Sequence, residues 1–296
     1  MTLIKKNRAQ RWYFNFQILK LAFVNYVKEG AFFHGAALAY YTLFALVPIL
    51  YLSISTFGKI VGHDKMISLI QQLFKEKIGL SDSDKIMDFL NVIDIKNGSW
   101  LMEVFSVFVL LYACSAFLVS LKRSLNEFLV AKQHGNQNII LNIIGFRFLS
   151  VFLLAIFALV IILFYFFQIF AVSLLEQWMM SHNGVVDFSM YLLNHLLSIT
   201  SNVIIFWVIF KYVNDAKLSS KLALKGAILT AILLYASQLG IKYYLQNYFF
   251  LGKSGVAGSL FILLAWVNYS AQIIFFGAKY THVLQQKTEG GIVKNR

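Results

Sequence analysis

Residues 33–61 read FHGAALAYYTLFALVPILYLSISTFGKIV, an almost uninterrupted apolar run. A helix rises about 1.5 Å per residue, so about twenty apolar residues cross a hydrocarbon core about 30 Å thick. Further runs of sufficient length follow along the chain, and they cover about 100–121, 143–172, 190–213, 222–245 and 258–284. The sequence therefore predicts an all-α integral membrane protein, built as a bundle of six transmembrane helices.

The composition supports the same class of protein. Of 296 residues, 59% are apolar and only 13% are charged, and the mean hydropathy is +0.69. A soluble domain of this length carries about a quarter charged residues, so a water-exposed globule is excluded. The net charge of +13 would indicate a nucleic-acid partner in a soluble protein. Here the basic residues gather at the ends of apolar runs, which indicates membrane orientation and anionic lipid instead.

The distribution of lysine and arginine predicts the orientation. Basic residues crowd the N-terminal segment and the connections after the second and fourth runs, whereas the connection at about 173–189 has none. Cytoplasmic loops of membrane proteins carry this excess of positive charge. Both termini are therefore expected in the cytoplasm. The basic residues counted include Lys5, Lys6, Arg8, Arg11, Lys122, Arg123, Lys132, Lys211, Lys217, Lys221 and Lys225.

These predictions divide the chain into three parts. Residues 1–32 form a cytoplasmic N-terminal segment with an interfacial amphipathic helix, 33–284 the transmembrane domain, and 285–296 a cytoplasmic tail. Within the domain, the more polar stretch 62–99 has apolar residues at helical spacing. Its amphipathic helices are expected outside the cytoplasm. They lie either on the membrane surface or in a small soluble cap.

The sequence offers little for enzyme chemistry. It has no phosphate-binding glycine loop, no HExxH and no GxSxG. Its six histidines are scattered, and Cys114 is the only cysteine, so neither a disulfide nor a cysteine-based zinc cluster is expected. We therefore expect a protein that is not an enzyme and that carries no metal and no cofactor.

Polar residues deep in two of the runs are candidates for a substrate path. Tyr40 and Tyr41 precede Pro48, which frees a backbone carbonyl that must find a partner in protein or in a water-filled cavity. Asn268 and Gln272 lie one turn apart on one helix face, next to Tyr269. This pair either bonds across helices as structural glue or lines a path for substrate.

Three stretches carry a resemblance to a known family. They are GAALAYYTLFALVPIL in the first run, LKRSLNEF after the second, and KSGVAGSLFILLAWVNYSAQIIFFGAKY near the C-terminus. The first resembles the AxLAYYxLFSLxP signature of the YihY/BrkB family of bacterial inner-membrane proteins, some of which bear a ribonuclease BN label. The other two are similar to that family's short helix-end motif and to its C-terminal block. The chain departs from the family at Ala45, Ala257 and Lys279, where Ser, Tyr and Glu are common, and in lacking a proline after the fourth run.

The resemblance implies six helices in the bacterial cytoplasmic membrane and adds Asn126 and Trp266 to the substrate-path candidates. The function that we expect is a transporter or flippase-like activity on a lipidic or amphipathic substrate. Membrane lipids are the expected partners, with anionic phospholipids or glycolipids as candidates, and a homo-oligomer is compatible with this. The alternative is a scaffold in envelope assembly. A ribonuclease is not supported, because clustered metal-binding carboxylates are missing. The candidates for lipid head-group contacts are Lys122, Arg123, Lys211 and Lys217.

Overall fold

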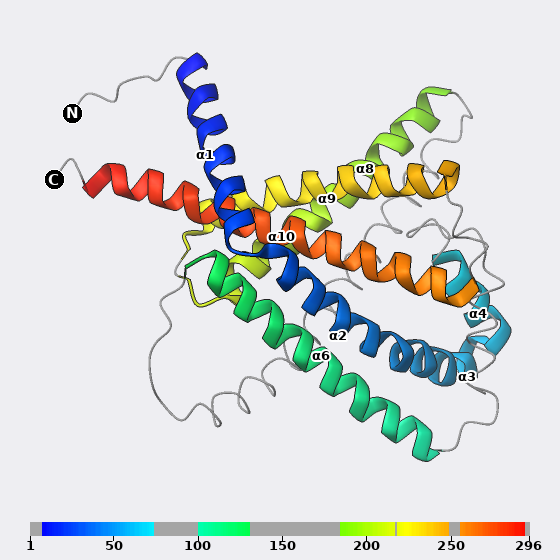
Figure 1. Ribbon diagram of the computed structural model, residues 1–296. Coiled ribbons are helices and arrows are strands. Elements are labelled where there is room, and N and C mark those ends of the chain that lie inside the picture. Colours follow the sequence, from blue (N-terminus) through cyan, green and yellow to red (C-terminus); the bar gives the residue numbers. More distant parts are fainter. Residues whose placement is uncertain (1–7, 74–99, 131–183, 217, 249–254, 294–296) are drawn as a thin grey trace, which may run out of the picture.

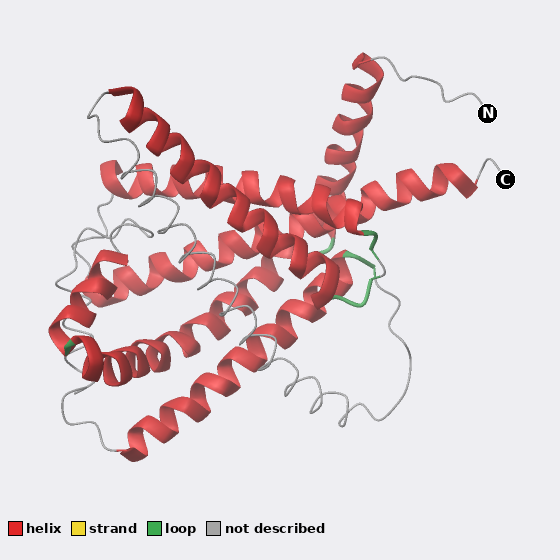
Figure 2. Ribbon diagram, turned by 180° about the vertical axis from the view of Figure 1, so that it is seen from behind, coloured by secondary structure: helices red, strands yellow, loops and turns green. Residues whose placement is uncertain are grey.

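The computed structural model describes residues 8–73, 100–130, 184–216, 218–248 and 255–293, and these are almost entirely helical, with no strand among them (Figure 2). The elements are α1 (Arg8–Lys28), α2 (Ala31–Leu52), the π-helical turn η1 (Ser53–Phe57), α3 (Gly58–Val61), α4 (His63–Leu73), α6 (Trp100–Phe128), α8 (Gly184–Val208), the π-helical turn η4 (Ile209–Val213), α9 (Ser220–Tyr248) and α10 (Gly255–Val293).

Five described helices are long and apolar enough to cross a membrane. Their candidate spans are Ala31–Ser55, Trp100–Phe128, His195–Val213, Ser220–Ile241 and Phe261–Thr288. The prediction of a helical membrane protein is thus confirmed. The predicted third span, 143–172, and the part of 62–99 beyond Leu73 lie outside the described residues, whereas 63–73 forms the expected helix as α4.

Two helices extend beyond the apolar runs that predicted them. α6 continues past 121 to Phe128, and α10 continues past 284 to Val293. The extension of α6 consists of the polar sequence KRSLNEF. Hydropathy detects only the part of a helix that faces lipid, so it ends a helix too early wherever polar turns continue outside the apolar core.

Helix α2 lies between α6 and α10, and α9 lies between α8 and α10 (Figure 1). Small side chains allow this close packing, since Ala223, Ala227 and Ala231 of α9 and Ala278 of α10 are all completely buried. Interfaces between membrane helices favour such residues because lipid provides no hydrophobic drive between helices, and dispersion contacts depend on close approach.

The described chain begins and ends at the same end of the bundle, and α3 and α4 lie at the opposite end (Figures 1 and 2). We call these the terminal end and the distal end. At the terminal end, His34 near the start of α2 lies 2.8 Å from the Ser124 hydroxyl near the end of α6. Asn126 of α6 also bonds to Asp215, just after η4. The helices α6 and α8 therefore both run toward the terminal end.

The hydrophobic core is concentrated near the terminal end. Phe128 of α6 and Phe275 of α10 are fully buried and stack with their ring centroids 5.1 Å apart. His34 packs edge-on against both rings, and Phe210 of η4 is buried in the same cluster. Stacked and edge-to-face rings stabilise such a core beyond the area that they bury.

Helix α1 packs one face on the bundle and leaves another open. Ile18 and Ala22 are buried against Val283 and Leu284 of α10, whereas Phe16, Phe23 and Val27 are more than half exposed. This pattern fits the amphipathic helix expected within 1–32. Its position at the membrane surface stays a prediction.

Candidate functional site

An apolar groove of about 330 Å³ lies between α2 and α6 on the distal side of the core. Pro48, one of the predicted path residues, is buried in its wall. The remaining lining is almost wholly apolar, with the buried Ser106 among the few polar groups. The lining residues are Leu43, Phe44, Pro48, Tyr51, Met102, Phe105, Ser106 and Val109. The volume is at the lower end of the range of about 300–1,000 Å³ for ligand sites.

Charged and hydroxyl groups gather where the groove ends toward the distal side. Glu103 of α6 accepts hydrogen bonds at Oε1 from the Ser55 hydroxyl at 2.6 Å and from the Lys59 ammonium at 2.9 Å. Ser55 belongs to η1, and π-helical turns are frequent at functional sites because they re-aim side chains. We call Ser55, Lys59 and Glu103 the polar mouth of the groove.

Tyr51 joins the groove to this polar mouth. Its side chain is 1% exposed and lines the groove, and its hydroxyl is buried with no hydrogen-bond partner among the described residues. Tyr51 lies four residues before Ser55 of the polar mouth and lines the groove together with Met102, the residue before Glu103. A buried hydroxyl without a partner costs about 1–3 kcal/mol, so native proteins seldom keep one without a reason.

The predicted tyrosines of α2 lie beside the groove rather than in its wall. Tyr40 is 55% exposed, and its ring packs against Tyr41 and, at 4.8 Å between centroids, against Phe44. Phe44 in turn lines the groove. These two tyrosines therefore support the wall of the groove from the outer surface of α2.

The predicted polar pair of α10 lies in a different place, at the junction of α1, α2 and α10. Gln272 donates to Asn268 at 3.0 Å and accepts from the Tyr26 hydroxyl at 3.3 Å. Gly35 of α2 packs directly on this pair, since a Cβ there would lie 3.0 Å from the Asn268 carbonyl oxygen and 3.2 Å from Gln272 Cγ. The geometry fits the packing role that the sequence left open.

The other two path candidates on α10 are not brought to the groove either. Trp266 is half-buried, and Tyr269 is about half exposed. The residues in the groove wall, namely Pro48 and its neighbours, are thus separate from the set on α10. The sequence named both sets as candidates for a substrate path, and a role of either set in such a path stays a prediction.

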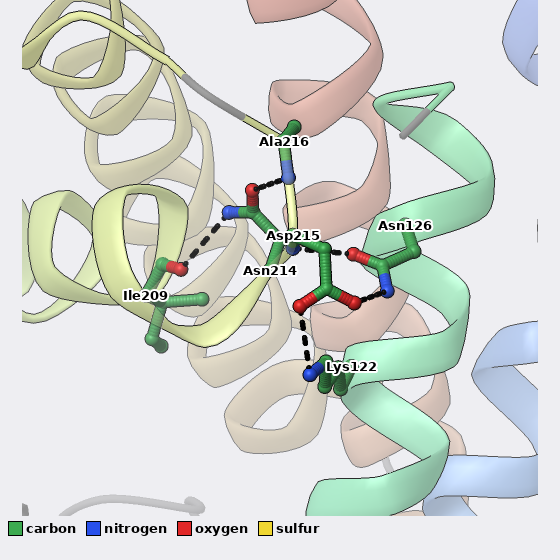
Figure 3. A network of polar contacts seen from close by, with 6 residues as sticks. All are labelled: Lys122, Asn126, Ile209, Asn214, Asp215 and Ala216. Atoms are coloured by element: carbon green, nitrogen blue, oxygen red, sulfur yellow. Dashed lines mark hydrogen bonds and ion pairs between the residues drawn. The ribbon is translucent and has the colours of Figure 1, made fainter. Parts of the chain in front are cut away.

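At the terminal end, a polar network ties α6 to the connection between η4 and α9 (Figure 3). Asn126 donates through Nδ2 to Asp215 Oδ2 at 2.7 Å, and its Oδ1 accepts from the Asp215 backbone N–H at 2.8 Å. Lys122 lies one turn earlier on the same helix face and pairs with Asp215 Oδ1 at 2.8 Å. Asn126 therefore attaches the connection to α6 through two hydrogen bonds, and Asp215 balances the charge of Lys122.

Asn214 shapes this connection from within. Its amide donates to the Ile209 carbonyl at 3.4 Å, and its Oδ1 accepts from the Ala216 N–H at 2.9 Å (Figure 3). The amide also donates to the Phe210 carbonyl at 2.7 Å. These bonds satisfy carbonyls that the end of a helix leaves without intrahelical partners. Asn214 therefore ends the helix at a defined residue. A proline after the span would have the same effect by a different mechanism.

The four lipid head-group candidates have different surroundings. Lys211 donates to the Leu218 carbonyl at 2.6 Å, and Lys122 is paired as described, so both have partners within the chain. Arg123 is exposed, and Lys217 lies outside the described residues. Two of the four candidates thus have partners within the chain, so fewer basic side chains support anionic lipid binding at this end than the sequence indicated.

Two acidic residues that the sequence analysis did not single out make the main ionic contacts at this end. Asp215 is one, and Glu29 is the other, paired at 2.5 Å with Lys279, whose side chain is 3% exposed. A signal was present in the sequence. Acidic residues number only 13, so each one in or near a span is a candidate partner for a lysine. No group of three or more His, Cys, Asp or Glu side chains gathers as a metal site within the described ranges.

A family model described as Virulence factor BrkB matches residues 22–296, which include all five described spans. No curated protein and no solved structure matches the chain. The family match covers nearly the whole chain and confirms the resemblance carried by the first span, the end of α6 and the sixth run. The chain therefore belongs to the BrkB virulence factor family.

Proposed function

We propose that this protein binds a lipidic or amphipathic molecule in the groove between α2 and α6 and moves it across the membrane, as a transporter or flippase-like protein. The observation that carries the proposal is the groove itself. It combines an apolar wall with a polar mouth at one end. An amphipathic molecule has the same division into an apolar chain and a polar head, so the two are complementary.

The proposal includes a topology of six spans in the bacterial cytoplasmic membrane, with both termini in the cytoplasm. The helices α6 and α8 follow one another among the described helices and both end at the terminal end, so the chain needs one further crossing between them. The predicted span at 143–172 would supply it. Arg123, Lys221 and Lys225 are exposed near this end, which supports a cytoplasmic placement.

Transport is tested by reconstituting the full chain into liposomes with a fluorescent single-chain phospholipid. Ser106 is 7% exposed and lies in the groove wall, so Ser106→Phe should fill the groove and abolish the accelerated movement. The matched control is Val107→Phe on the same helix. Val107 is 41% exposed and does not line the groove, so this variant should behave like the parent. Equal rates for protein-containing and empty liposomes would contradict the proposal.

A further inference from the structure

We propose that the polar mouth of the groove recognises a zwitterionic head group that carries both a phosphate and an ammonium, as in an aminophospholipid with a single apolar chain in the groove. This inference rests on the proposed function, because it assigns the head group of the molecule that the groove would take. It adds the chemical class of the ligand and the residues that select it.

The polar mouth contains one positive and one negative side chain in direct contact. Glu103 is 31% exposed and Lys59 is 64% exposed, and they meet at 2.9 Å. Exposed ion pairs of this kind add little stability because water screens them. Separating Lys59 from Glu103 therefore costs little free energy, and each side chain then binds a charged group of the ligand instead. A head group with an ammonium and a phosphate supplies both, so neither Glu103 nor Lys59 is left without a counter-charge.

Tyr51 provides a donor that none of the described residues uses. Its hydroxyl is buried without a hydrogen-bond partner among them, and Tyr51 lies four residues before Ser55, which bonds to Glu103. A phosphate oxygen bound to the Lys59 ammonium would accept from this hydroxyl after a small shift of the ring. The ammonium of the head group would then pair with Glu103, to which Ser55 already donates.

Head groups with only one charge fit the mouth less well. A purely anionic head group would satisfy Lys59 but would set a second negative charge against Glu103, which is repulsive. A purely cationic one would leave Lys59 facing a like charge. Two of the lysines at the terminal end are also occupied by partners inside the chain, which removes part of the reason to expect an anionic ligand.

The inference is tested by measuring binding of lysophosphatidylethanolamine and lysophosphatidylglycerol to the full chain in detergent or nanodiscs. We expect the zwitterionic lipid to bind about tenfold more tightly, the effect of one charge-assisted hydrogen bond. Glu103→Gln should remove this preference, because it deletes the carboxylate that pairs with the ammonium of the zwitterionic lipid and that repels the anionic lipid. The zwitterionic lipid should then bind more weakly, and the anionic lipid as tightly as before or more tightly. Lys59→Met should weaken both lipids, and the matched control Lys65→Met, at an exposed lysine of α4 outside the mouth, should weaken neither.

Tyr51→Phe separates recognition from structure. Because it deletes a hydroxyl that has no partner among the described residues, it should leave Tm unchanged or raise it while weakening the zwitterionic lipid several-fold. A lowered Tm with unchanged affinity would instead show a structural role and would overturn this part. If both lipids bound equally and Ser106→Phe abolished this binding, the head-group assignment would be wrong and the proposed function would stand. Binding of neither lipid would contradict the proposed function itself.

Discussion

Thr230 of α9 lies directly on Gly277 of α10, and the contact is repeated in reverse where Thr281 of α10 lies on Gly226 of α9. A Cβ at Gly277 would be 3.0 Å from Thr230 Cβ, and one at Gly226 would be 3.2 Å from Thr281 Cβ. Each threonine hydroxyl donates to the carbonyl of the glycine four residues earlier on its own helix, at 2.8 and 2.7 Å. The two helices therefore interlock through small residues, and both threonine hydroxyls are hydrogen-bonded.

Gly277→Ala should destabilise the protein because the new methyl group has no room against Thr230. Overpacking of this kind costs about 1–3 kcal/mol. The second substitution Thr230→Ala removes the hydroxyl that the new Cβ meets, so the double variant should recover part of the loss. Thermal unfolding in detergent measures both effects.

The control for this prediction is Gly240→Ala. Gly240 lies in α9, and a Cβ there would meet nothing within 4 Å. Replacing an unconfined helical glycine should stabilise the helix by about 0.5–1 kcal/mol. If Gly277→Ala and Gly240→Ala changed Tm equally and in the same direction, the interlocked contact would not be a determinant of stability.

Asn126→Ala should loosen the connection between η4 and α9. The variant loses both bonds to Asp215, for a cost of about 1 kcal/mol because the site is exposed to water. Hydrogen exchange of the amides at 214–219 should rise, while exchange within α9 stays as it was. Arg123→Gln, at an exposed neighbour on α6, serves as control and should leave the exchange of this segment unchanged.

Lys279→Met should destabilise the junction between α1 and α10. It leaves Glu29 partly buried without its cation, a loss of up to about 3 kcal/mol. The exchanged pair Glu29→Lys with Lys279→Glu restores opposite charges and should recover most of the stability. The charge-exchanged protein should therefore unfold at a higher temperature than either single variant. A double variant as unstable as the sum of the singles would argue against direct pairing.

Tyr26 should make stability depend on pH in the alkaline range. Burial, and to a lesser extent Tyr269, raises the pKa of Tyr26 from its usual 10 to about 12. The unfolded chain loses this proton first, so the neutral phenol contributes its full stability below pH 10 and loses it as the pH rises toward 12. Between these values the parent protein should lose stability relative to Tyr26→Phe. Parallel curves for the two proteins would contradict the assignment.

The proposed topology predicts opposite accessibility at the two ends. Cys114 is the only cysteine, so Cys114→Ser gives a background for single-cysteine labelling. In spheroplasts, a membrane-impermeant maleimide should label Lys65→Cys at the distal end but should reach Lys221→Cys at the terminal end only after lysis. Labelling of both sites before lysis would contradict the topology.

The sequence alone determined the membrane class, the family and the approximate place of every described span. These properties are local, because a run of about twenty apolar residues forms a spanning helix whichever helices surround it. The same locality explains why α6 and α10 extend beyond their apolar runs, since polar turns continue each helix outside the apolar window.

The tertiary structure decided which side chains meet. Asn126 finds Asp215 across 89 positions and Lys279 finds Glu29 across 250, and neither pairing leaves a periodic trace in the sequence. The tertiary structure also separated Pro48, which lies in the groove wall, from Gln272, which lies at the junction of α1 and α10. In the sequence the two residues look alike, because a proline and a polar residue each interrupt an apolar run. A run of sequence specifies how deep a residue lies in the membrane. Only the packing of whole helices specifies the direction in which it faces and the partner that it finds.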